Sequence, residues 1–366
     1  MTNKTDASNE TAGDARRSNA ILCLAPNAAY QVTVLFEHIE LGQVNRAVKQ
    51  TNSLGGKGQN FAVATKEYYD KTDRVTLLQL AGGATGVQIE AMEEALGFDY
   101  ITVHTDEPTR TCTTCIDART GEMTEMVGVS GTVSREAEVQ YESTAIALLQ
   151  GVRPPRVLAV CGTFPPGLQA QAVARIVAAK MDGTLVFVDA VQDVHPVLAT
   201  RCIDILKVNS GEVLSILADD PKYRGKAPHE VDLAAAAADL AHRYSIATVA
   251  VTDGPSTAYL VDTDGSSYGF TIPDLLGEQE KFLLQGGGES ATNSEGKLVL
   301  NPLGAGDTCS AVMVNRLMDG LPMVDAFALG LAAASASCLV LMPNCVFDRK
   351  VMHRIRDRIT ITKVPK

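Results

Sequence analysis

Short apolar runs alternate with amphipathic segments through most of the chain. Apolar runs of strand length occupy 19–27, 74–83, 156–162, 184–190, 202–209 and 246–254. Between them, apolar residues at helical spacing predict helices at 58–70, 85–96, 168–181 and 231–244. Parallel strands need a crossover connection, which is usually a helix. The alternation therefore favours an α/β fold in which a mainly parallel sheet carries helices on both faces.

Two segments depart from this alternation and are rich in β-forming residues. They are residues 29–52 and about 99–130, and the second contains the turn ARTG, which predicts a hairpin. We expect these segments to form a small β-sheet lid at one edge of the body. Gly, Glu, Ser and Asn dominate 277–297, which predicts a mobile insertion. Polar residues of mixed charge at 1–19 predict a disordered tail, with 20–366 as the folded domain.

Composition narrows the range of partners. The chain has 366 residues and a net charge of −11, with 43 acidic against 32 basic residues. A nucleic acid or an anionic membrane would favour a basic face, so we expect neither partner. The apolar stretch around 329–342 is interrupted by serines and indicates a buried helix, not a membrane span.

The eight cysteines are scattered, mostly through apolar contexts, which fits reduced thiols in a cytoplasmic protein. Cys112 and Cys115 form a C-x-x-C, but they lie on an expected strand. Positions three apart on a strand face opposite sides, so this pair makes a poor metal site and we expect a structural role.

The first candidate for chemistry is the stretch NPLGAGDTCSAVM at 301–313. Gly304, Ala305 and Gly306 have almost no side chain, and the residues from Asp307 onward have helical spacing. The first N–H groups of such a helix have no partner within it and lie at the positive end of its dipole. That arrangement suits an anion, above all a phosphate. The alternative is a loop in which Asp307 only caps the helix.

A second glycine cluster, SLGGKGQNFAVA at 53–64, lies where the first β-rich segment returns to the body. Its glycines expose backbone, Lys57 supplies a cation, and Asn60 offers a donor and an acceptor at the start of a helix. The alternative is an ordinary glycine-rich turn. The sequence has neither the G-x-x-x-x-G-K-S/T phosphate loop nor an early G-x-G-x-x-G, so the common nucleotide folds are not indicated.

The two glycine clusters, GGKGQN and GAGD, resemble the two signatures of the PfkB, or ribokinase-like, carbohydrate kinases. The resemblance covers about residues 20–345 and includes AGGATG, CGTFPPG, KVNSGE and TDGPS in family order. It implies a ribokinase-like three-layer α/β sandwich with a mainly parallel central sheet and a small β-sheet lid. The stretches EPTRTCTTCI and TEMVGVSG are most similar to the branch whose acceptors already carry a phosphate, such as 1-phosphofructokinase and tagatose-6-phosphate kinase.

By this resemblance, Asp307 is the general base that takes the proton of the acceptor hydroxyl. Gly304, Ala305 and Gly306 belong to the same catalytic turn, and the N–H groups of residues 305–307 would bind the transferring phosphoryl group. Phosphoryl transfer depends on positioning and fixed dipoles more than on covalent chemistry, which agrees with an anion-binding turn.

The resemblance also implies ATP and Mg²⁺. Asn209 and Glu212 would organise the nucleotide phosphates and the metal, with Glu212 acting through a water, and Thr252 and Gly254 would line the nucleotide groove. Magnesium suits such a site because it keeps most of its waters. From the residues alone, Asn209 and Glu212 also fit an ordinary helix start with an acid in its first turn.

On the acceptor side, the resemblance implies four binding residues: Gly56, Lys57, Asn60 and, for the phosphate, Arg110. From the residues alone, an arginine on a strand is more often a surface residue. The family's first strand normally supplies an aspartate that holds sugar hydroxyls. Here APNAAYQVT contains no acid, and Gln31, or Tyr30 in another register, takes that place. Glutamine donates and accepts but lacks the charge that strengthens such bonds.

The predicted function is ATP-dependent transfer of a phosphoryl group to a hydroxyl of a sugar phosphate, such as fructose or tagatose phosphate. Two alternatives stay open: a kinase of a neutral sugar or nucleoside, and a sugar-sensing protein without turnover. The missing acid near Gln31 favours the second alternative, and the intact Asp307 opposes it. Relatives use such a lid as a dimer contact, and an uncovered apolar sheet face favours a partner, so we expect a homodimer.

Overall fold

The computed structural model describes residues 20–190, 192–278, 282 and 298–364. The expected tail at 1–19 lies outside the described residues. The expected insertion at 277–297 also lies outside them, apart from residues 277, 278 and 282.

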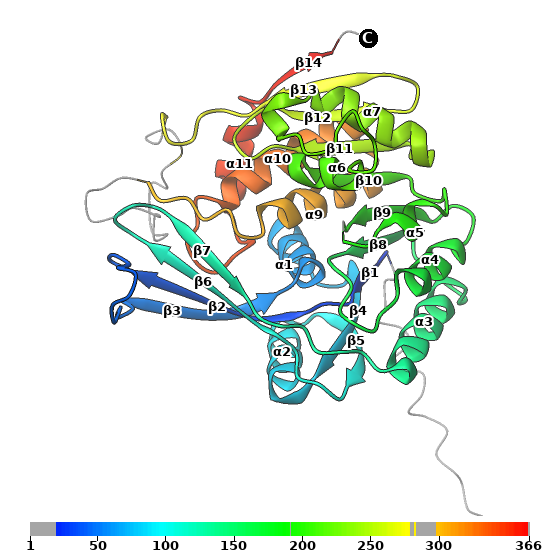
Figure 1. The fold of residues 1–366 in the computed structure, drawn as a ribbon, viewed down its shortest axis with the longest axis horizontal. Helices are drawn as coiled ribbons and strands as arrows, with labels where there is room; N and C mark the ends of the chain where they lie inside the picture. The colour runs from blue at the N-terminus through cyan, green and yellow to red at the C-terminus, as the bar shows by residue number, and fades with distance from the viewer. Residues whose placement is uncertain (1–19, 191, 279–281, 283–297, 365–366) are drawn as a thin grey trace, which may run out of the picture.

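A ten-stranded sheet forms the middle layer of the body (Figure 1). Its order is β14-β13-β12-β11-β10-β9-β8-β1-β4-β5. The strands from β11 to β5 run parallel to their neighbours, and β12, β13 and β14 are antiparallel at the other edge. The bounds are β1 Ile21–Ala25, β4 Val75–Gly82, β5 Asp99–Thr105, β8 Val157–Cys161, β9 Leu185–Asp189, β10 Ile205–Asn209, β11 Thr248–Thr252, β12 Ala258–Asp262, β13 Ser267–Thr271 and β14 Thr360–Lys363.

Helices cover both faces of this sheet. Along β1, Ile21 and Cys23 enter the apolar cluster of one face, and Leu22 and Leu24 enter that of the other. The first face is covered by α1 Lys57–Tyr69, α2 Gly83–Leu96, α9 Ala305–Met318, α10 Met323–Ser337 and α11 Arg349–Arg356. The second face is covered by α3 Arg135–Leu149, α4 Ala170–Ala178, α5 His195–Leu198, α6 Ser210–Ile216 and α7 Leu233–Tyr244, with a short 3₁₀ turn at Pro228–Glu230. The predicted three-layer α/β sandwich is confirmed.

The four predicted helices are α1, α2, α4 and α7, with bounds shifted by up to three residues. The buried helix expected around 329–342 is the second half of α10, which ends at Ser337. In the part of the chain that the structure describes, no helix is long and apolar enough to cross a membrane.

A separate four-stranded sheet projects from the body, in the order β3-β2-β6-β7 (Figure 1). Its strands are β2 Ala29–Phe36, β3 Lys49–Gly55, β6 Thr111–Asp117 and β7 Met123–Val127. Strand β2 pairs antiparallel with β3 and parallel with β6, so the two β-rich segments come together as expected. The hairpin predicted at ARTG is the connection between β6 and β7.

The expected start of the second lid segment at residue 99 is wrong. Strand β5 (Asp99–Thr105) belongs to the large sheet, where it pairs parallel with β4. From Ile101 to His104 its sequence alternates apolar and polar residues, as a half-buried strand does in either sheet. Propensity gives the element type but not the pairing partner, and helix α2 provides the crossover from β4 that makes the parallel pair possible.

Asp117 holds the outer end of the small sheet together. Its carboxylate is 4% exposed and accepts hydrogen bonds at 2.8–3.0 Å from the N–H groups of Ile39, Arg119 and Thr120, and His38 Nδ1 lies 2.8 Å away. These groups belong to the connection after β2 and to the β6–β7 turn, so one side chain joins both. Burial raises the pKa of Asp117, but the donors outweigh it and lower that pKa to about 2.

We predict that Asp117→Asn destabilises the small sheet by ~1–3 kcal/mol, because an amide leaves part of this buried donor set unpaired. Hydrogen exchange of the β2 and β6 amides should become faster, while exchange in β4 stays unchanged. Since the folded-state pKa is depressed, the stabilisation is present above the unfolded-state pKa of about 4 and is lost as pH falls toward about 2. Glu125→Gln on exposed β7 is the control; an equal loss in both variants would contradict this role.

Candidate active site

Helix α9 begins after a turn that requires glycine. Gly304 is the N-cap residue with a φ of 75°, in the left-handed region that other side chains disfavour. A Cβ atom at this position would lie 2.3 Å from Sγ of Cys345. Asp307 is therefore the third residue inside the helix, and the alternative in which it only caps the helix does not hold.

The first turn of α9 offers two backbone donors to an anion. The N–H groups of Gly306 and Asp307 have no hydrogen-bond partner among the described residues. The N–H group of Ala305 differs from the sequence expectation, because it donates to the carbonyl oxygen of Pro302 at 3.1 Å. These two donors, at residues 306 and 307, lie at the positive end of a 14-residue helix, which is an arrangement that suits an anion; we refer to it below as the anion-binding turn.

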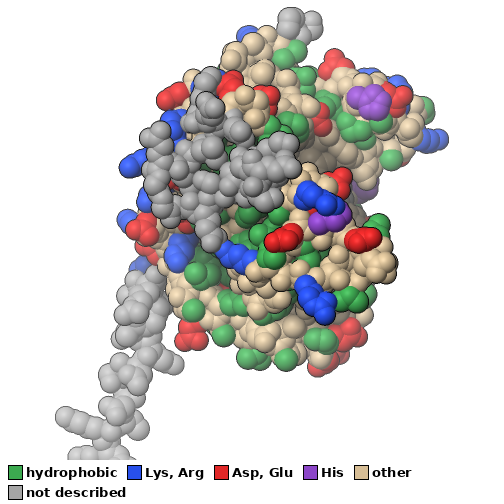
Figure 2. Space-filling model, turned by 90° about the vertical axis from the view of Figure 1, so that its left-hand side faces the viewer, with side chains coloured by type: hydrophobic (Ala, Val, Ile, Leu, Met, Phe, Trp, Pro, Cys, Tyr) green, Lys and Arg blue, Asp and Glu red, His purple; other side chains and the backbone are tan. Residues whose placement is uncertain are grey.

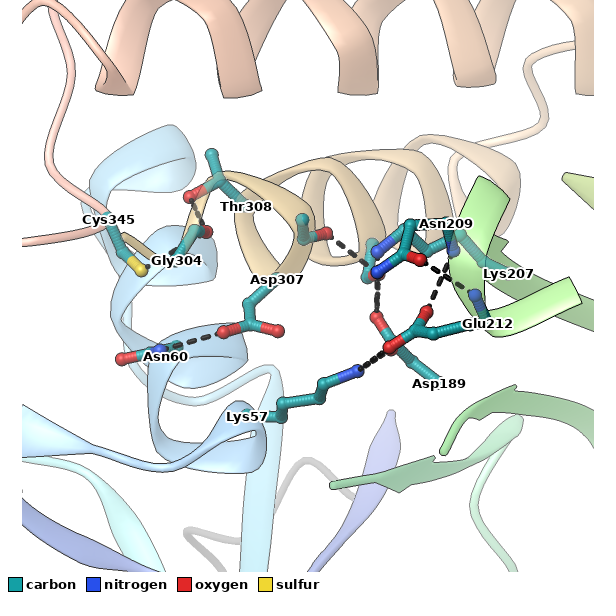
Figure 3. Close-up of polar contacts among 12 residues, drawn as sticks. Lys57, Asn60, Asp189, Lys207, Asn209, Glu212, Gly304, Asp307, Thr308 and Cys345 are labelled. Atoms are coloured by element: carbon teal, nitrogen blue, oxygen red, sulfur yellow. Dashed lines mark hydrogen bonds and ion pairs between the residues drawn. The ribbon is translucent and has the colours of Figure 1, made fainter. Parts of the chain in front are cut away.

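The carboxylate of Asp307 is buried at the centre of the site (Figure 3). The amide of Asn60, from the first turn of α1, donates to its Oδ2 at 2.7 Å. Burial is the main cause that raises the pKa of Asp307, and the nearby charge of Asp189 adds to it. Lys57, Lys207 and the Asn60 hydrogen bond act in the opposite direction and leave this pKa at about 6. A carboxylate of this kind can accept a proton near neutral pH.

A buried cluster of charges lies beside Asp307. Asp189, at the carboxyl end of β9, accepts from Lys57 Nζ at 2.6 Å, from Lys207 Nζ at 3.0 Å and from Ser310 Oγ at 2.7 Å. Burial raises the pKa of Asp189, but the two lysines outweigh it and hold that pKa well below its usual range. A Cβ atom on Gly306 would lie 2.9 Å from Lys207 Nζ, so this ammonium group lies directly behind the anion-binding turn.

Asp189, Lys207 and Ser310 were not identified from the sequence. Asp189 ends the apolar run LVFV, and Lys207 interrupts the apolar strand ILKVN. Charges inside strands that are buried on both faces are costly unless they are paired, and ligands of open α/β sheets bind at the carboxyl ends of the strands. Those two signals together could have identified the first two residues; Ser310 offers no comparable signal.

Asn209 and Glu212 meet at the start of α6, where they form a reciprocal cap. Asn209 Oδ1 accepts from the Glu212 N–H group at 2.9 Å, and Glu212 Oε2 accepts from the Asn209 N–H group at 2.7 Å. The other oxygen of Glu212, Oε1, lies 3.4 Å from Lys57 Nζ (Figure 3). The ordinary helix-start interpretation is therefore correct for the local structure, and the same carboxylate also reaches the charged cluster.

The donor set near Glu212 fits only a metal that brings its own ligands. No group of three or more His, Cys, Asp or Glu side chains suited to a metal occurs within residues 20–190, 192–278, 282 and 298–364. Magnesium commonly keeps several waters and takes further oxygens from nucleotide phosphates. One carboxylate such as Glu212, acting through water, is compatible with that chemistry.

Thr252 and Gly254 lie next to this helix start. Thr252 on β11 pairs with Asn209 on β10, so the two strands end at the same edge of the sheet. Gly254 has a φ of 55° in the turn that follows, and the carboxylate of Asp253 in the same turn accepts from Ser210 Oγ. The residues predicted for the nucleotide groove are thus adjacent in space.

The glycines of the second cluster let α1 pack closely against β1. Gly56 is the N-cap residue with a φ of 100°, and a Cβ atom there would lie 2.9 Å from the carbonyl oxygen of Asn27. A Cβ atom on Gly58 would lie 2.3 Å from that of Ala25. This close packing brings Lys57 and Asn60 to the site.

Arg110 and Gln31 make no hydrogen bond or ion pair with this cluster among the described residues. Arg110 Nη2 donates to the Asn27 carbonyl oxygen at 3.1 Å, and its buried Nε has no partner there. The side chain lines a cavity of about 830 Å³ that Ser130 and Thr163 also line. Gln31 is buried in the small sheet and donates to Thr114 Oγ1 at 3.0 Å.

The chain is similar to several known proteins. The chain is 26% identical to tagatose-6-phosphate kinase of Staphylococcus epidermidis over 200 residues, which cover 54% of this chain and 62% of that relative. It is 24% identical to 1-phosphofructokinase of Bacillus subtilis over 317 residues, which cover 86% of this chain and 90% of the relative. The structure of phosphofructokinase-2 from Escherichia coli in complex with substrates and products shares the fold, with a TM-score of 0.73 and 20% identity over 92% of this chain and 98% of that one.

The sequence profile of the pfkB family carbohydrate kinases matches residues 27–343. This match covers most of the chain and includes the site residues described above except Cys345, which lies just after its end. The chain belongs to the pfkB family of carbohydrate kinases.

Proposed function

We propose that this protein transfers the γ-phosphoryl group of ATP to a hydroxyl group of a sugar phosphate, such as fructose or tagatose phosphate. One observation supports this proposal most directly. The buried carboxylate of Asp307 lies in the first turn of α9, beside the two unpaired N–H groups of that turn and held by Asn60. A base and an anion site are then within one helical turn of each other, as phosphoryl transfer to an alcohol requires.

In this mechanism, Asp307 accepts the proton of the attacking hydroxyl through Oδ1. Oδ2 already accepts a hydrogen bond from Asn60, whereas Oδ1 has no hydrogen-bond partner among the described residues. The N–H groups of Gly306 and Asp307 bind the oxygens of the transferring group, and Lys207 adds positive charge behind them. These groups are fixed before the reaction starts, so they stabilise the transition state without reorganising.

The nucleotide binds across the carboxyl ends of β10 and β11. Thr252 and Gly254 contact the nucleotide, and Asn209 and Glu212 organise its phosphates. Glu212 would hold magnesium there through a water molecule, and the ion would supply positive charge to neutralise the phosphates. The pairing of Asn209 with Thr252 in the sheet register supports this placement.

The acceptor binds between the small sheet and the body. Lys57, Asn60 and Gly56 hold the sugar, with Gln31 as a further contact from the small sheet, and Arg110 holds the phosphate. The unpaired Nε of Arg110 beside an open cavity supports this role, because a guanidinium binds a phosphate with two parallel hydrogen bonds. The names of the relatives, a tagatose-6-phosphate kinase and a 1-phosphofructokinase, support an acceptor of this class.

We propose a cytoplasmic homodimer that contacts through the small sheet. The eight cysteines are free, which suits a reducing compartment. Large exposed apolar side chains are concentrated in the small sheet and its loops: Leu41, Val44, Val48, Met126, Val127 and Val129. Figure 2 shows basic and acidic side chains interspersed over one face of the molecule. Neither this face nor the net charge of −11 provides the basic surface that a nucleic acid would favour.

For Asp307→Asn, we predict loss of turnover with retention of fold and nucleotide binding. General-base contributions are on the order of 10²–10⁴-fold, and the loss should appear mainly in kcat. In the parent, kcat/KM should fall below pH 6, because Asp307 accepts a proton only when ionised and its pKa is about 6. Release of ADP, measured with a panel of phosphorylated and plain sugars, checks both expectations.

Asp319→Asn is the control for this variant. Asp319 follows the other end of α9 and binds Arg74, so its loss should leave turnover within a few-fold of the parent. An Asp307→Asn protein with activity close to the parent would overturn the general-base assignment and, with it, the proposed function.

For Arg110→Ala, we predict a steep rise in KM for the sugar phosphate, a smaller change in kcat and an unchanged KM for ATP. Breaking a desolvated charge pair costs about 2–5 kcal/mol, or roughly 30-fold to several-thousand-fold in affinity. The phosphate lies away from the reacting hydroxyl, so its binding energy appears mostly in the ground state. Arg119→Ala, an exposed arginine in the β6–β7 turn, is the control. A parent that uses a plain sugar equally well would favour the neutral-acceptor alternative.

For the homodimer, we predict that the parent sediments as a dimer at micromolar concentration and that Val127→Lys shifts it toward the monomer. Val127 is 59% exposed on the edge strand β7, where a charge opposes both apolar contact and edge pairing. Val152→Lys is the matched control, because Val152 is fully exposed in the loop after α3, away from the small sheet. A parent that sediments as a monomer would contradict the dimer and leave the kinase proposal standing.

A further inference from the structure

A chain of side-chain hydrogen bonds runs from the small sheet to Asp307. Ser53 Oγ, on β3, donates to Asn344 Oδ1 at 3.0 Å. Asn344 Nδ2 donates to Asn60 Oδ1 at 2.7 Å, and Asn60 Nδ2 donates to Asp307 Oδ2 at 2.7 Å. Both amides are 6% exposed. These hydrogen bonds connect β3, the loop after α10, α1 and α9, and their successive members are 291, 284 and 247 positions apart in the sequence. The last member is the base of the proposed reaction.

The order of donors and acceptors in this chain is set by its last member. An ionised carboxylate only accepts hydrogen bonds, so Asn60 must turn its N–H₂ group toward Asp307. The oxygen of Asn60 then faces Asn344, which must donate. If the Asn60 amide were turned over, two acceptor oxygens would meet at one contact and two N–H₂ groups at the other, both at about 2.7 Å.

We infer that Asn344 is a positioning residue for the general base. It holds the Asn60 amide in the one orientation that donates to ionised Asp307, and through Ser53 it links that orientation to the position of the small sheet. This inference rests on the proposed function, because it gives Asp307 the role of base. Among the described residues, Asn344 makes its side-chain hydrogen bonds with Ser53, Asn60 and Cys345 and acts on Asp307 only through Asn60.

Packing around Asn344 supports a fixed orientation. Asn344 lies in the loop after α10, and its neighbour Cys345 has a φ of 63° and donates to the Gly304 carbonyl oxygen at 3.5 Å. A Cβ atom on Gly304 would lie 3.4 Å from Asn60 Nδ2 and 3.6 Å from Asn344 Nδ2. The two amides are therefore enclosed between the catalytic turn and β3, and neither has room to rotate freely.

Substituting Asn344 changes the hydrogen-bond chain and leaves the charges around the base in place. The ionisable groups that act on or face Asp307 are Asp189, Lys57, Lys207, Cys161 and Cys345. The hydrogen bond with Cys23, together with burial, raises the pKa of the Cys161 thiol, and burial raises the pKa of the Cys345 thiol, so both are neutral near pH 7. Without Asn344, only the carboxylate of Asp307 holds the Asn60 amide in its donating orientation, and the ionised form of Asp307 loses part of its stabilisation. The pKa of Asp307 should then rise above its parent value of about 6.

The test is the pH dependence of kcat/KM in the full-length protein with its sugar-phosphate acceptor and ATP. Asn344→Leu should move the acid limb upward by about 0.5–1 pH unit, the scale of one hydrogen bond expressed as a pKa shift. At pH 8, where Asp307 is ionised in both proteins, kcat should stay within a few-fold of the parent. Ser53→Ala should move the limb in the same direction by less. If Asn344→Leu does not fold, Asn344→Ala takes its place.

Thr51→Val is the matched control. Thr51 lies two residues before Ser53 on the same strand, and its hydroxyl contacts Met342 Sδ at 3.2 Å in the same loop, but it is not part of the chain. Its acid limb should stay at the parent position. An unmoved limb in Asn344→Leu, or an equal shift in Thr51→Val, would overturn the inference. A shift in Asn344→Leu with none in Ser53→Ala would overturn the link to the small sheet.

A second readout needs no turnover and separates this inference from the proposed function. The folded-state pKa of Asp307 is raised above its unfolded value, so this group stabilises the fold at low pH and the stabilisation is lost as pH rises through about 6. The Tm of the parent minus that of Asp307→Asn should therefore decrease through pH 6. In the Asn344→Leu background the decrease should extend to a higher pH, because only the folded-state pKa has risen. If the parent phosphorylates no sugar but this shift is seen, the proposed function fails and the positioning role of Asn344 stands.

Discussion

The site depends on one buried carboxylate, that of Asp189. It is shared by the ammonium groups of Lys57 and Lys207, and Ser310 donates to the same oxygen as Lys207. Each of these charges would strongly destabilise the fold if it were buried alone. Removing one partner from a buried ion pair typically lowers the free energy of unfolding by about 3–5 kcal/mol. The cluster joins the start of α1, the end of β9, strand β10 and the first turns of α9. These elements cannot separate without leaving a charge unpaired in the interior.

The same cluster sets the basicity of Asp307. Two lysines alone would hold the pKa of Asp307 low, and a strongly ionised carboxylate is a weak base. Asp189 cancels part of that positive field, and burial raises the pKa further, to about 6. A general base works best when its pKa is near the operating pH. The two lysines still place positive charge beside the first turn of α9, so in the proposed reaction one cluster would act on both the base and the transferring phosphoryl group.

The sequence predicted the parts of this arrangement that depend on local structure. Alternating strands and helices, and the glycine turns before Lys57 and Asp307, follow from backbone geometry that neighbouring residues determine. Contacts between residues that are far apart in the sequence were harder to predict. Strand β5 has the pattern of a lid strand but pairs with β4, and Asn344 meets Asn60 from 284 positions away. Nothing local in the loop after α10 indicates that its asparagine completes a contact to the catalytic turn.

Glu212 shows why a structural and a functional interpretation of one residue need not compete. Its Oε2 caps α6 through the Asn209 N–H group, while its Oε1 reaches Lys57 Nζ at 3.4 Å. The cap fixes the carboxylate in place, because one oxygen is held by the backbone and the side chain cannot turn away. The second oxygen is then held toward the cluster that surrounds Asp307. The hydrogen bond that caps the helix is thus also what fixes the direction of the second carboxylate oxygen, and the ordinary helix start accounts for the fixed position of Glu212 beside Lys57.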